Sequence, residues 1–421
     1  MKSRTLLNNG PVGTGWRRTA RRWGSVAASV LMILTVTALG SSAAASARGP
    51  RQGLHVAADR GTIAKSGRGK RVLVKHAPLA AGTNGQDVIS SQVATGGNTV
   101  QVDEPRITSV GAAGPMLPCD IYAAAHTPCV AAYSTVRALY GSYDGPLYQV
   151  QRASDQAVSN IGLLRPGGTA DAAAQEAFCA GTSCTITMIY DQSGHENDLA
   201  IEDHDKAASA TALPVTIGGH TVYGVYIRPG MGYRHPAPSS GVAVGDEPEG
   251  MYMVTGGVHV NRGCCFDFGN VEAKIHDDGA GHMDAVNFST KCYFGNCTAD
   301  GPWVQADLEN GLFQSDKGTD KLNKGNTSTF VTALLKNNGR TVFTLKGGNA
   351  RRGSLTIWYS GPLPNRYSPM QKEGSIVLGT GGDGTNLSRG YFFEGVMTAG
   401  YPPDAADNAV QANIVAAGYL S

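Results

Sequence analysis

The sequence predicts an all-β protein built as a two-sheet β-sandwich with a few short helices. From Met116 onward, short apolar runs alternate with turn residues, and glycine accounts for 56 of the 421 residues, a pattern typical of all-β domains. A domain of about 300 residues is large for one sheet, which favours two packed sheets. The sequence contains no recognisable internal repeat.

Residues 1–47 predict an export signal. Six basic and no acidic side chains occur before residue 48, an apolar run covers residues 26–39, and small residues end at Ala47; this order is typical of secretory signals. The apolar run is shorter than the ~20 residues that span a bilayer. We therefore expect a secreted protein that leaves the membrane when the signal is removed, with an uncleaved anchor as the alternative. Paired arginines at 17–18 and 21–22 also admit twin-arginine export.

Residues 48–115 are expected to form a poorly ordered linker or propeptide, or alternatively a small strand-forming extension, because their composition fits both. Nine basic and four acidic residues give this segment a charge of +5. Since the signal carries +6 and the whole chain +2, residues 116–421 carry −9. An acidic main domain lacks the basic face of a nucleic-acid-binding protein, so nucleic acid is excluded as the expected partner.

Several elements of the domain at 116–421 can be assigned by pattern. Residues 329–336 and 341–346 flank Asn337-Asn338-Gly339, which predicts a hairpin because Asn-Gly tolerates positive φ angles. Residues 354–359 and 375–379 read as two further strands. Apolar residues at helical spacing predict helices over 130–140 and 404–417, the second with Asp404 as N-cap after two prolines.

Two carboxylates lie two residues apart at Asp307 and Glu309. In a strand, positions i and i+2 face the same side, so both side chains are expected to project together. Two like charges that close raise the proton affinity of at least one of them, which is a feature of catalytic sites. A solvated strand face or a pair of calcium ligands is the alternative.

A third carboxylate, Asp383, follows a strand-like run within Gly381-Gly382-Asp383-Gly384. Glycines beside an acid let backbone approach a ligand closely and place the side chain on a loop at a sheet end. An ordinary turn has the same composition, so this motif by itself leaves both interpretations open.

Eight cysteines in an exported chain are expected to form disulfides. Cys119 with Cys129, Cys179 with Cys184, and Cys292 with Cys297 could close short loops, which leaves the neighbours Cys264 and Cys265. Adjacent α-carbons lie about 3.8 Å apart across a trans peptide, below the ~4.4–6.8 Å of ordinary disulfides. A strained bond between neighbours favours a functional site. Distant partners for these two cysteines, or a zinc site, are the alternatives.

Several motifs resemble the catalytic domain of the α-L-arabinofuranosidases of glycoside hydrolase family 54. The resemblance extends from about Pro118 to the C-terminus. It is carried by residues 245–252, 263–270 and 301–313, and further by 118–122, 137–140, 190–194, 347–350 and 411–417.

This resemblance implies a concanavalin-like, jelly-roll type of β-sandwich and a retaining, exo-acting hydrolase that needs no cofactor or metal. Glu309 would be the nucleophile and Asp383 the general acid/base, with their carboxyl groups about 5–5.5 Å apart. The resemblance further implies that a Cys264–Cys265 disulfide packs against the sugar, and it supports the pairs Cys119–Cys129 and Cys179–Cys184. The implied sugar-binding residues are Asp307, Asn310, Gly382, Cys264, Cys265 and Phe294.

Three departures from the family pattern affect the expected specificity. Phe294 stands where the family has a pocket tryptophan, which keeps an aromatic face but loses the indole donor. Cys292 and Cys297 flank that position and look like an added disulfide. The arabinose-binding domain that often follows in this family is not seen before Ser421, so weaker binding to polymeric arabinoxylan is expected.

The function expected from the sequence is release of terminal arabinofuranose from arabinan or arabinoxylan side chains by a monomeric enzyme. A noncatalytic sugar-binding module is the main rival, since concanavalin-like sandwiches also serve as lectins. A glycosidase with another furanoside specificity, an endo-glucanase and a structural cell-surface protein are the remaining alternatives.

Overall fold

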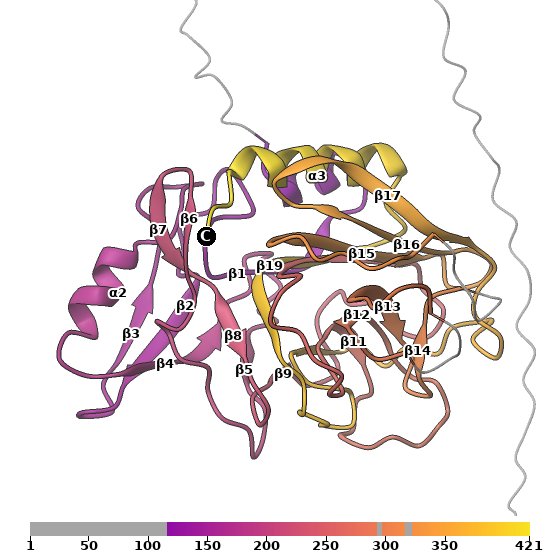
Figure 1. Cartoon of the computed structure of the whole chain (residues 1–421), viewed down its shortest axis with the longest axis horizontal. Helices are drawn as coiled ribbons and strands as arrows, with labels where there is room; N and C mark the ends of the chain where they lie inside the picture. The colour runs from indigo at the N-terminus through magenta and orange to yellow at the C-terminus, as the bar shows by residue number, and fades with distance from the viewer. Residues whose placement is uncertain (1–115, 293–296, 316–321) are drawn as a thin grey trace, which may run out of the picture. The chain divides into compact units, whose positions relative to one another are not determined.

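The computed structural model describes residues 116–292, 297–315 and 322–421. The predicted export signal and linker, and also Phe294, lie outside the described residues. Within them, strands dominate and form two large antiparallel sheets plus one hairpin (Figure 1). The prediction of a two-sheet all-β fold is confirmed.

The seven-stranded sheet contains the predicted hairpin. Its strands, in spatial order, are β1 (Cys129–Ser134), β19 (Gly390–Ala399), β10 (Glu249–Thr255), β15 (Val331–Asn337), β16 (Phe343–Asn349) and β17 (Arg352–Gly361), with β8 (Val225–Ile227) also paired to β19. β15 and β16 pair antiparallel around Asn338-Gly339, and Gly339 has φ 76°. The Asn-Gly sequence therefore predicted this hairpin correctly, because the turn requires a residue with a positive φ angle.

The ten-stranded sheet contains the strands that later position the candidate site. Its spatial order is β14 (Leu312–Phe313), β13 (Trp303–Asp307), β12 (Asp284–Ser289), β11 (Asp267–Val271), β18 (Ser375–Leu378), β9 (Tyr233–His235), β5 (Leu199–Ile201), β4 (Cys184–Ile189), β2 (Tyr148–Arg152) and β3 (Val158–Ile161). The predicted strands at 354–359 and 375–379 correspond to parts of β17 and to β18.

The remaining elements are a β-hairpin and three helices. The hairpin joins β6 (Pro214–Ile217) and β7 (His220–Tyr223), and the helices are α1 (Pro118–Ala124), α2 (Ala172–Phe178) and α3 (Asp404–Ala417). Helix α3 was predicted with the right bounds, but Pro403 holds the N-cap position and Asp404 begins the helix. None of the helices in the described part of the chain has the length and apolar character that crossing a bilayer demands.

The helix predicted over 130–140 is wrong. Its first half is strand β1, which is buried along its whole length and pairs with β19. A continuous apolar run fits a buried helix and a fully buried strand equally well. Pairing with a neighbouring strand, which periodicity cannot show, decides between them.

The hydrophobic core lies between the two large sheets. Phe268 of β11 packs against Phe392 of β19 and edge-on against Tyr133 of β1, with ring centroids 5.6 and 6.0 Å apart. Along β13, Val304 and Ala306 belong to this core, so the alternate positions, Gln305 and Asp307, face away from the opposite sheet. The core thus fixes which side chains reach the outer face of the ten-stranded sheet.

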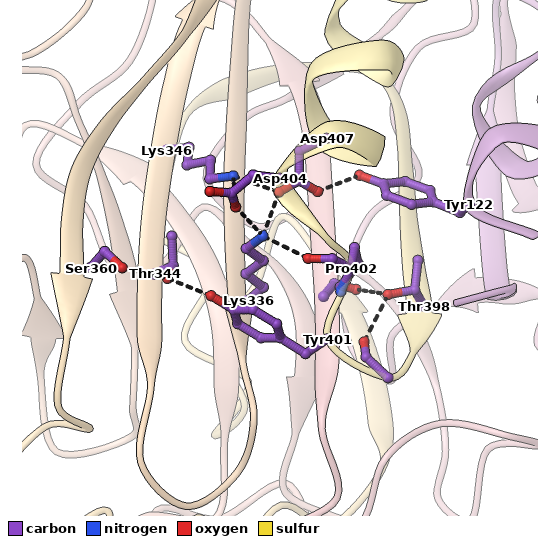
Figure 2. Close-up of polar contacts among 12 residues, drawn as sticks. Tyr122, Lys336, Thr344, Lys346, Ser360, Thr398, Tyr401, Pro402, Asp404 and Asp407 are labelled. Carbon is purple, nitrogen blue, oxygen red and sulfur yellow. Dashed lines mark hydrogen bonds and ion pairs between the residues drawn. The ribbon is translucent and has the colours of Figure 1, made fainter. Parts of the chain in front are cut away.

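Helix α3 is fixed to the other side of the seven-stranded sheet by buried ion pairs (Figures 1 and 2). The ammonium groups of Lys336 in β15 and Lys346 in β16 each contact both Asp404 and Asp407 at 2.6–2.7 Å. Lys336 also donates to the Pro402 carbonyl oxygen at 2.6 Å. The two cations therefore hold the first turn of α3 against the sheet.

All eight cysteines are paired as expected. The disulfides are Cys119–Cys129, Cys179–Cys184, Cys264–Cys265 and Cys292–Cys297. The first joins α1 to the start of β1, and the second joins the end of α2 to β4. The peptide bond between Cys264 and Cys265 is cis.

Candidate active site

A cavity of about 380 Å³ opens on the outer face of the ten-stranded sheet. It is bounded by the residues before β11, those after β11 and those after β13, and by the loop after β18. The lining side chains and backbone segments are Cys264, Cys265, Glu272, Asp277, Met283, Asp307, Glu309, Asn310, Gly311, Gly381, Gly382, Asp383 and Thr385. Every predicted site residue that the structure describes is therefore in this one cavity.

Glu309 follows β13 and does not lie on it, contrary to the prediction of a shared strand face with Asp307. The strand ends at Asp307, and Glu309 has φ 71°, in the left-handed region. This backbone turn redirects its carboxylate away from the strand. The Asp307 carboxylate accepts a hydrogen bond from the Glu309 backbone N–H at 3.2 Å, which helps to hold the turn.

Four backbone N–H groups bind the Glu309 carboxylate. Asp278 and Gly279 donate to Oε1 at 2.8 Å each, and Gly281 and His282 donate to Oε2, the latter at 2.9 Å. Both oxygens are thus fixed by one short loop, residues 278–282. These hydrogen bonds hold the carboxylate in one orientation at the cavity wall. A side chain that reacts with a single atom of a ligand needs such a fixed orientation.

Asp307 lines the cavity with a buried carboxyl group, and its charge acts on Asp267 of β11. Burial, followed by the charge of Asp307, holds the pKa of Asp267 well above its usual range. Burial also raises the pKa of Asp307 to about 7. Asn287 of β12 donates to the other side of Asp267 at 2.5 Å.

Asp383 lies on the loop after β18 and is exposed to solvent. Its two oxygens accept hydrogen bonds from the backbone N–H and the hydroxyl of Thr385 at 2.8 and 2.7 Å. The same loop is tied to the vicinal cysteines, because the Cys265 N–H donates to the Thr385 carbonyl oxygen at 3.1 Å. An exposed carboxyl on a fixed loop can exchange protons with water as well as with a ligand.

The Cys264–Cys265 disulfide forms part of the cavity wall next to Asp307. The two sulfur atoms and a carboxylate oxygen of Asp307 all lie within 4.8 Å of one another. Because the sulfurs are bonded to each other, they present an apolar surface there and are not thiolates, the form that binds metals. The cavity wall therefore has an apolar surface directly beside a carboxyl group.

The loop of Gly381–Gly382 is held from below by Arg234 of β9. Its guanidinium group donates to the carbonyl oxygens of Gly381 and Gly382 at 3.3 and 2.6 Å, and to that of Glu272 at 3.3 Å. It also pairs with the Glu202 carboxylate at 2.7 Å. One buried cation thus connects the loop after β18 to the residue that follows β11.

Known proteins are similar to the part of the chain that holds this cavity. A family model described as the catalytic domain of α-L-arabinofuranosidase B matches residues 118–420. The chain belongs to this family. Two curated relatives are the probable α-L-arabinofuranosidase B of Aspergillus terreus, 52% identical over 318 residues (72% of this chain and 62% of the relative), and the α-L-arabinofuranosidase B of Emericella nidulans, 52% identical over 330 residues (74% and 63%).

Solved structures of glycoside hydrolase family 54 are similar as well. One is an α-L-arabinofuranosidase soaked with a cyclic sulfate inhibitor, and another is an arabinofuranosidase complexed with arabinofuranosyl-α-1,2-xylobiose. Each is 48% identical to this chain, with a TM-score of 0.70. The match covers 72% of this chain and 66% of the chain in the solved structure. The chain spans less than two thirds of the length of these relatives.

Sequence reasoning missed several residues of this family 54 site. Glu272, Asp277, Met283 and Gly311 line the cavity, and Asp267 and Arg234 support it from below. Asp267 belongs to the motif at residues 263–270, but nothing in the sequence shows that it lies near Asp307, two strands away in the sheet. The backbone N–H donors at 278–282 could not be predicted from the sequence, because backbone groups do not depend on which side chains are present.

Proposed function

We propose that this chain is a secreted, retaining, exo-acting α-L-arabinofuranosidase, with Glu309 as nucleophile and Asp383 as general acid/base. The observation that carries the proposal is that both carboxyl groups line a single cavity together with the Cys264–Cys265 disulfide. A lectin of similar architecture would need sugar-binding groups but no oriented pair of this kind.

The chemistry proceeds by double displacement. Glu309, aligned by the four backbone N–H groups, attacks the anomeric carbon while Asp383 gives its proton to the departing glycosidic oxygen. The resulting glycosyl ester of Glu309 is then cleaved by water, from which Asp383 takes a proton. The exposed position of Asp383 suits these two roles, since its proton is replenished from solvent.

The proposed substrates are arabinan and arabinoxylan side chains and the oligosaccharides derived from them. A cavity of about 380 Å³ accommodates one sugar residue, which favours removal of terminal units over cleavage within a chain. Support also comes from the names of the relatives and from the solved arabinofuranosidase that holds arabinofuranosyl-α-1,2-xylobiose.

Asn310, Gly382 and Asp307, together with the vicinal disulfide, are proposed to bind the furanose. The disulfide provides an apolar surface for the sugar ring, and the polar groups bind its hydroxyls. Phe294, which the sequence motifs indicate as a sugar-binding residue, is part of the same proposal. Export by the predicted signal, with residues 48–115 as linker or propeptide, and action as a monomer away from the membrane belong to the same proposal.

The proposal is tested with 4-nitrophenyl α-L-arabinofuranoside and three proteins, the wild type, Glu309→Gln and Asp383→Asn. We expect the wild type to release arabinose with retained configuration, measured by proton NMR, and each variant to lose at least about a thousandfold in kcat. Unchanged turnover in both variants would refute the assignment of the site. Binding of arabinose without turnover of any furanoside by the wild type would instead indicate a lectin.

A further inference from the structure

Glu272 is a cavity residue to which neither the sequence motifs nor the proposed mechanism gives a role. It follows directly after Val271, the last residue of β11, and is only 3% exposed. Both of its carboxyl oxygens are buried, and within the described part of the chain neither has a hydrogen-bond partner. A buried polar group without a partner is costly, so its retention at this position requires an explanation.

The Glu272 carboxyl group packs directly against Gly382. A Cβ atom added to Gly382 would overlap the Glu272 Oε2 atom, and its three nearest neighbours would all belong to the Glu272 carboxyl group. Gly382 does not have a positive φ, so its backbone conformation would accept alanine. Glycine is needed here because Glu272 fills the space where a side chain would go.

Arg234 fixes this contact from the other side without neutralising the acid. Its guanidinium group binds the backbone carbonyl oxygens of Glu272, Gly381 and Gly382, and its charge is paired with Glu202. One cation therefore holds the backbone of both Glu272 and Gly382, the two residues whose contact is described above.

The charges around Glu272 favour its neutral form. Burial is the largest cause that raises the pKa of Glu272 to about 8. The negative charges of Glu309 and Asp307 add to this shift, while the backbone N–H of Glu272 and the charge of Arg234 offset part of it. The other charged or titratable groups that line the two cavities bordered by Glu272 are Asp277 and Asp383 on one side and Lys274, His276, Asp278, His282, Lys372 and Glu373 on the other.

We propose that Glu272 is a positioning residue of the active site, whose neutral carboxyl group supports Gly382 and so holds Asp383 at its working position. This inference rests on the proposed function, since it concerns the acid/base of that reaction. Ionisation of Glu272 would place a third negative charge beside Asp307 and Glu309. The carboxyl group would then leave Gly382 or attract water, and the loop that carries Asp383 would lose its support.

The kinetic test compares Glu272→Gln and Glu272→Ala with the wild type on 4-nitrophenyl α-L-arabinofuranoside. Alanine leaves a gap beneath Gly382, so we expect kcat at pH 6 to fall about tenfold or more with a smaller change in KM. Glutamine restores most of that loss because it keeps the shape of the neutral acid. Glu176→Gln, on the exposed face of α2, is the matched control and should behave like the wild type.

The pH profile separates positioning from mere packing. Above about pH 8, log kcat of the wild type should fall more steeply than that of Glu272→Gln, by about one unit per pH unit, because only the wild type loses a second essential proton. Identical slopes in the two proteins would overturn the proposal.

A double variant tests the contact itself. Gly382→Ala should lower kcat strongly, and adding Glu272→Ala should restore part of it, because the second change removes the overlapping carboxyl group. Additive losses would contradict the proposed contact, provided that circular dichroism shows all three proteins folded.

One measurement is independent of turnover. The infrared difference spectrum between wild type and Glu272→Gln should contain the C=O band of a protonated carboxyl group at pH 6, and this band should be gone at pH 9.5. If the wild type has no arabinofuranosidase activity but shows this band, the proposed function fails while the neutral Glu272 stands. If the band is absent at pH 6, the inference fails whatever the activity.

Discussion

Three buried carboxyl groups at the cavity wall or beneath it retain their protons far more strongly than carboxyl groups in water. Burial raises the pKa of Asp267 well above its usual range, that of Asp307 to about 7 and that of Glu272 to about 8. Each would be ionised near pH 4 in the unfolded chain. At these three groups the folded protein therefore binds more protons than the unfolded chain between about pH 4 and 8.

This difference predicts that acid stabilises the fold in that range. A raised carboxyl pKa contributes stability that is complete below the unfolded value and is lost as the pH rises through the folded value. For Asp307 and Glu272 the loss occurs up to about pH 7 and 8. Thermal unfolding should thus show a falling Tm from pH 5 to 9, and the fall should be smaller in Glu272→Gln. A Tm that rises over this range in the wild type would contradict these pKa directions.

The sequence identified individual carboxyl groups but not their surroundings. Asp307, Glu309 and Asp383 stand in short motifs that resemblance could match residue by residue. Glu272 stands in none of them, and its importance depends on contacts with Gly382 and Arg234, which are 110 and 38 residues away in the chain. Such contacts follow from strand order and not from local pattern.

At the scale of elements, the loop at 278–282 and Glu309 stabilise each other. The loop supplies four backbone N–H groups, and the two carboxyl oxygens of Glu309 accept their hydrogen bonds. Sequence reasoning put Glu309 on a strand because the i, i+2 spacing fits one, and it could not detect the left-handed turn that ends β13.

Glu309→Gln is therefore predicted to loosen this loop as well as to stop the reaction. The amide NH₂ group faces backbone donors and leaves one or two of them unsatisfied, each at a cost of about 1–3 kcal/mol. Hydrogen–deuterium exchange should become faster at residues 278–282 in this variant. Asp383→Asn is the control, since Asp383 makes no hydrogen bond to that loop, and equal protection in both variants would refute the predicted role of the carboxylate.

Helix α3 depends on the cluster of Lys336, Lys346, Asp404 and Asp407 (Figure 2). Asp407 is almost fully buried, whereas the Asp404 side chain is 59% exposed. Removal of Asp407 leaves two buried ammonium groups with a single, exposed carboxylate, and removal of a buried charged partner costs about 3–5 kcal/mol.

Asp407→Ala should accordingly lower the free energy of unfolding by about 3–5 kcal/mol, and Asp404→Ala by about 1 kcal/mol or less. Urea denaturation of the two variants gives the comparison directly. Equal losses would show that burial of the carboxylate does not determine the strength of this contact.

At the scale of the whole molecule, the sequence predicted the class of fold but not the order of its strands. Alternating apolar runs and turn residues define strands locally, and the Asn-Gly turn fixed one pair, β15 with β16. The site depends on non-consecutive neighbours, since β18 lies beside β11 and β9 beside β18. That order brings Asp383, Glu272 and Arg234 together, and only tertiary structure reveals it.

The central claim, that Glu309 is the nucleophile and Asp383 the acid/base of one retaining site, is tested most directly by the configuration of the arabinofuranosyl azide formed from an activated aryl arabinofuranoside. In Asp383→Ala, azide takes the place of water in the second step, so the account predicts an α-azide. In Glu309→Ala, azide takes the place of the missing carboxylate, so the account predicts a β-azide. The opposite configurations, or no azide product from either variant while the wild type is active, would contradict it.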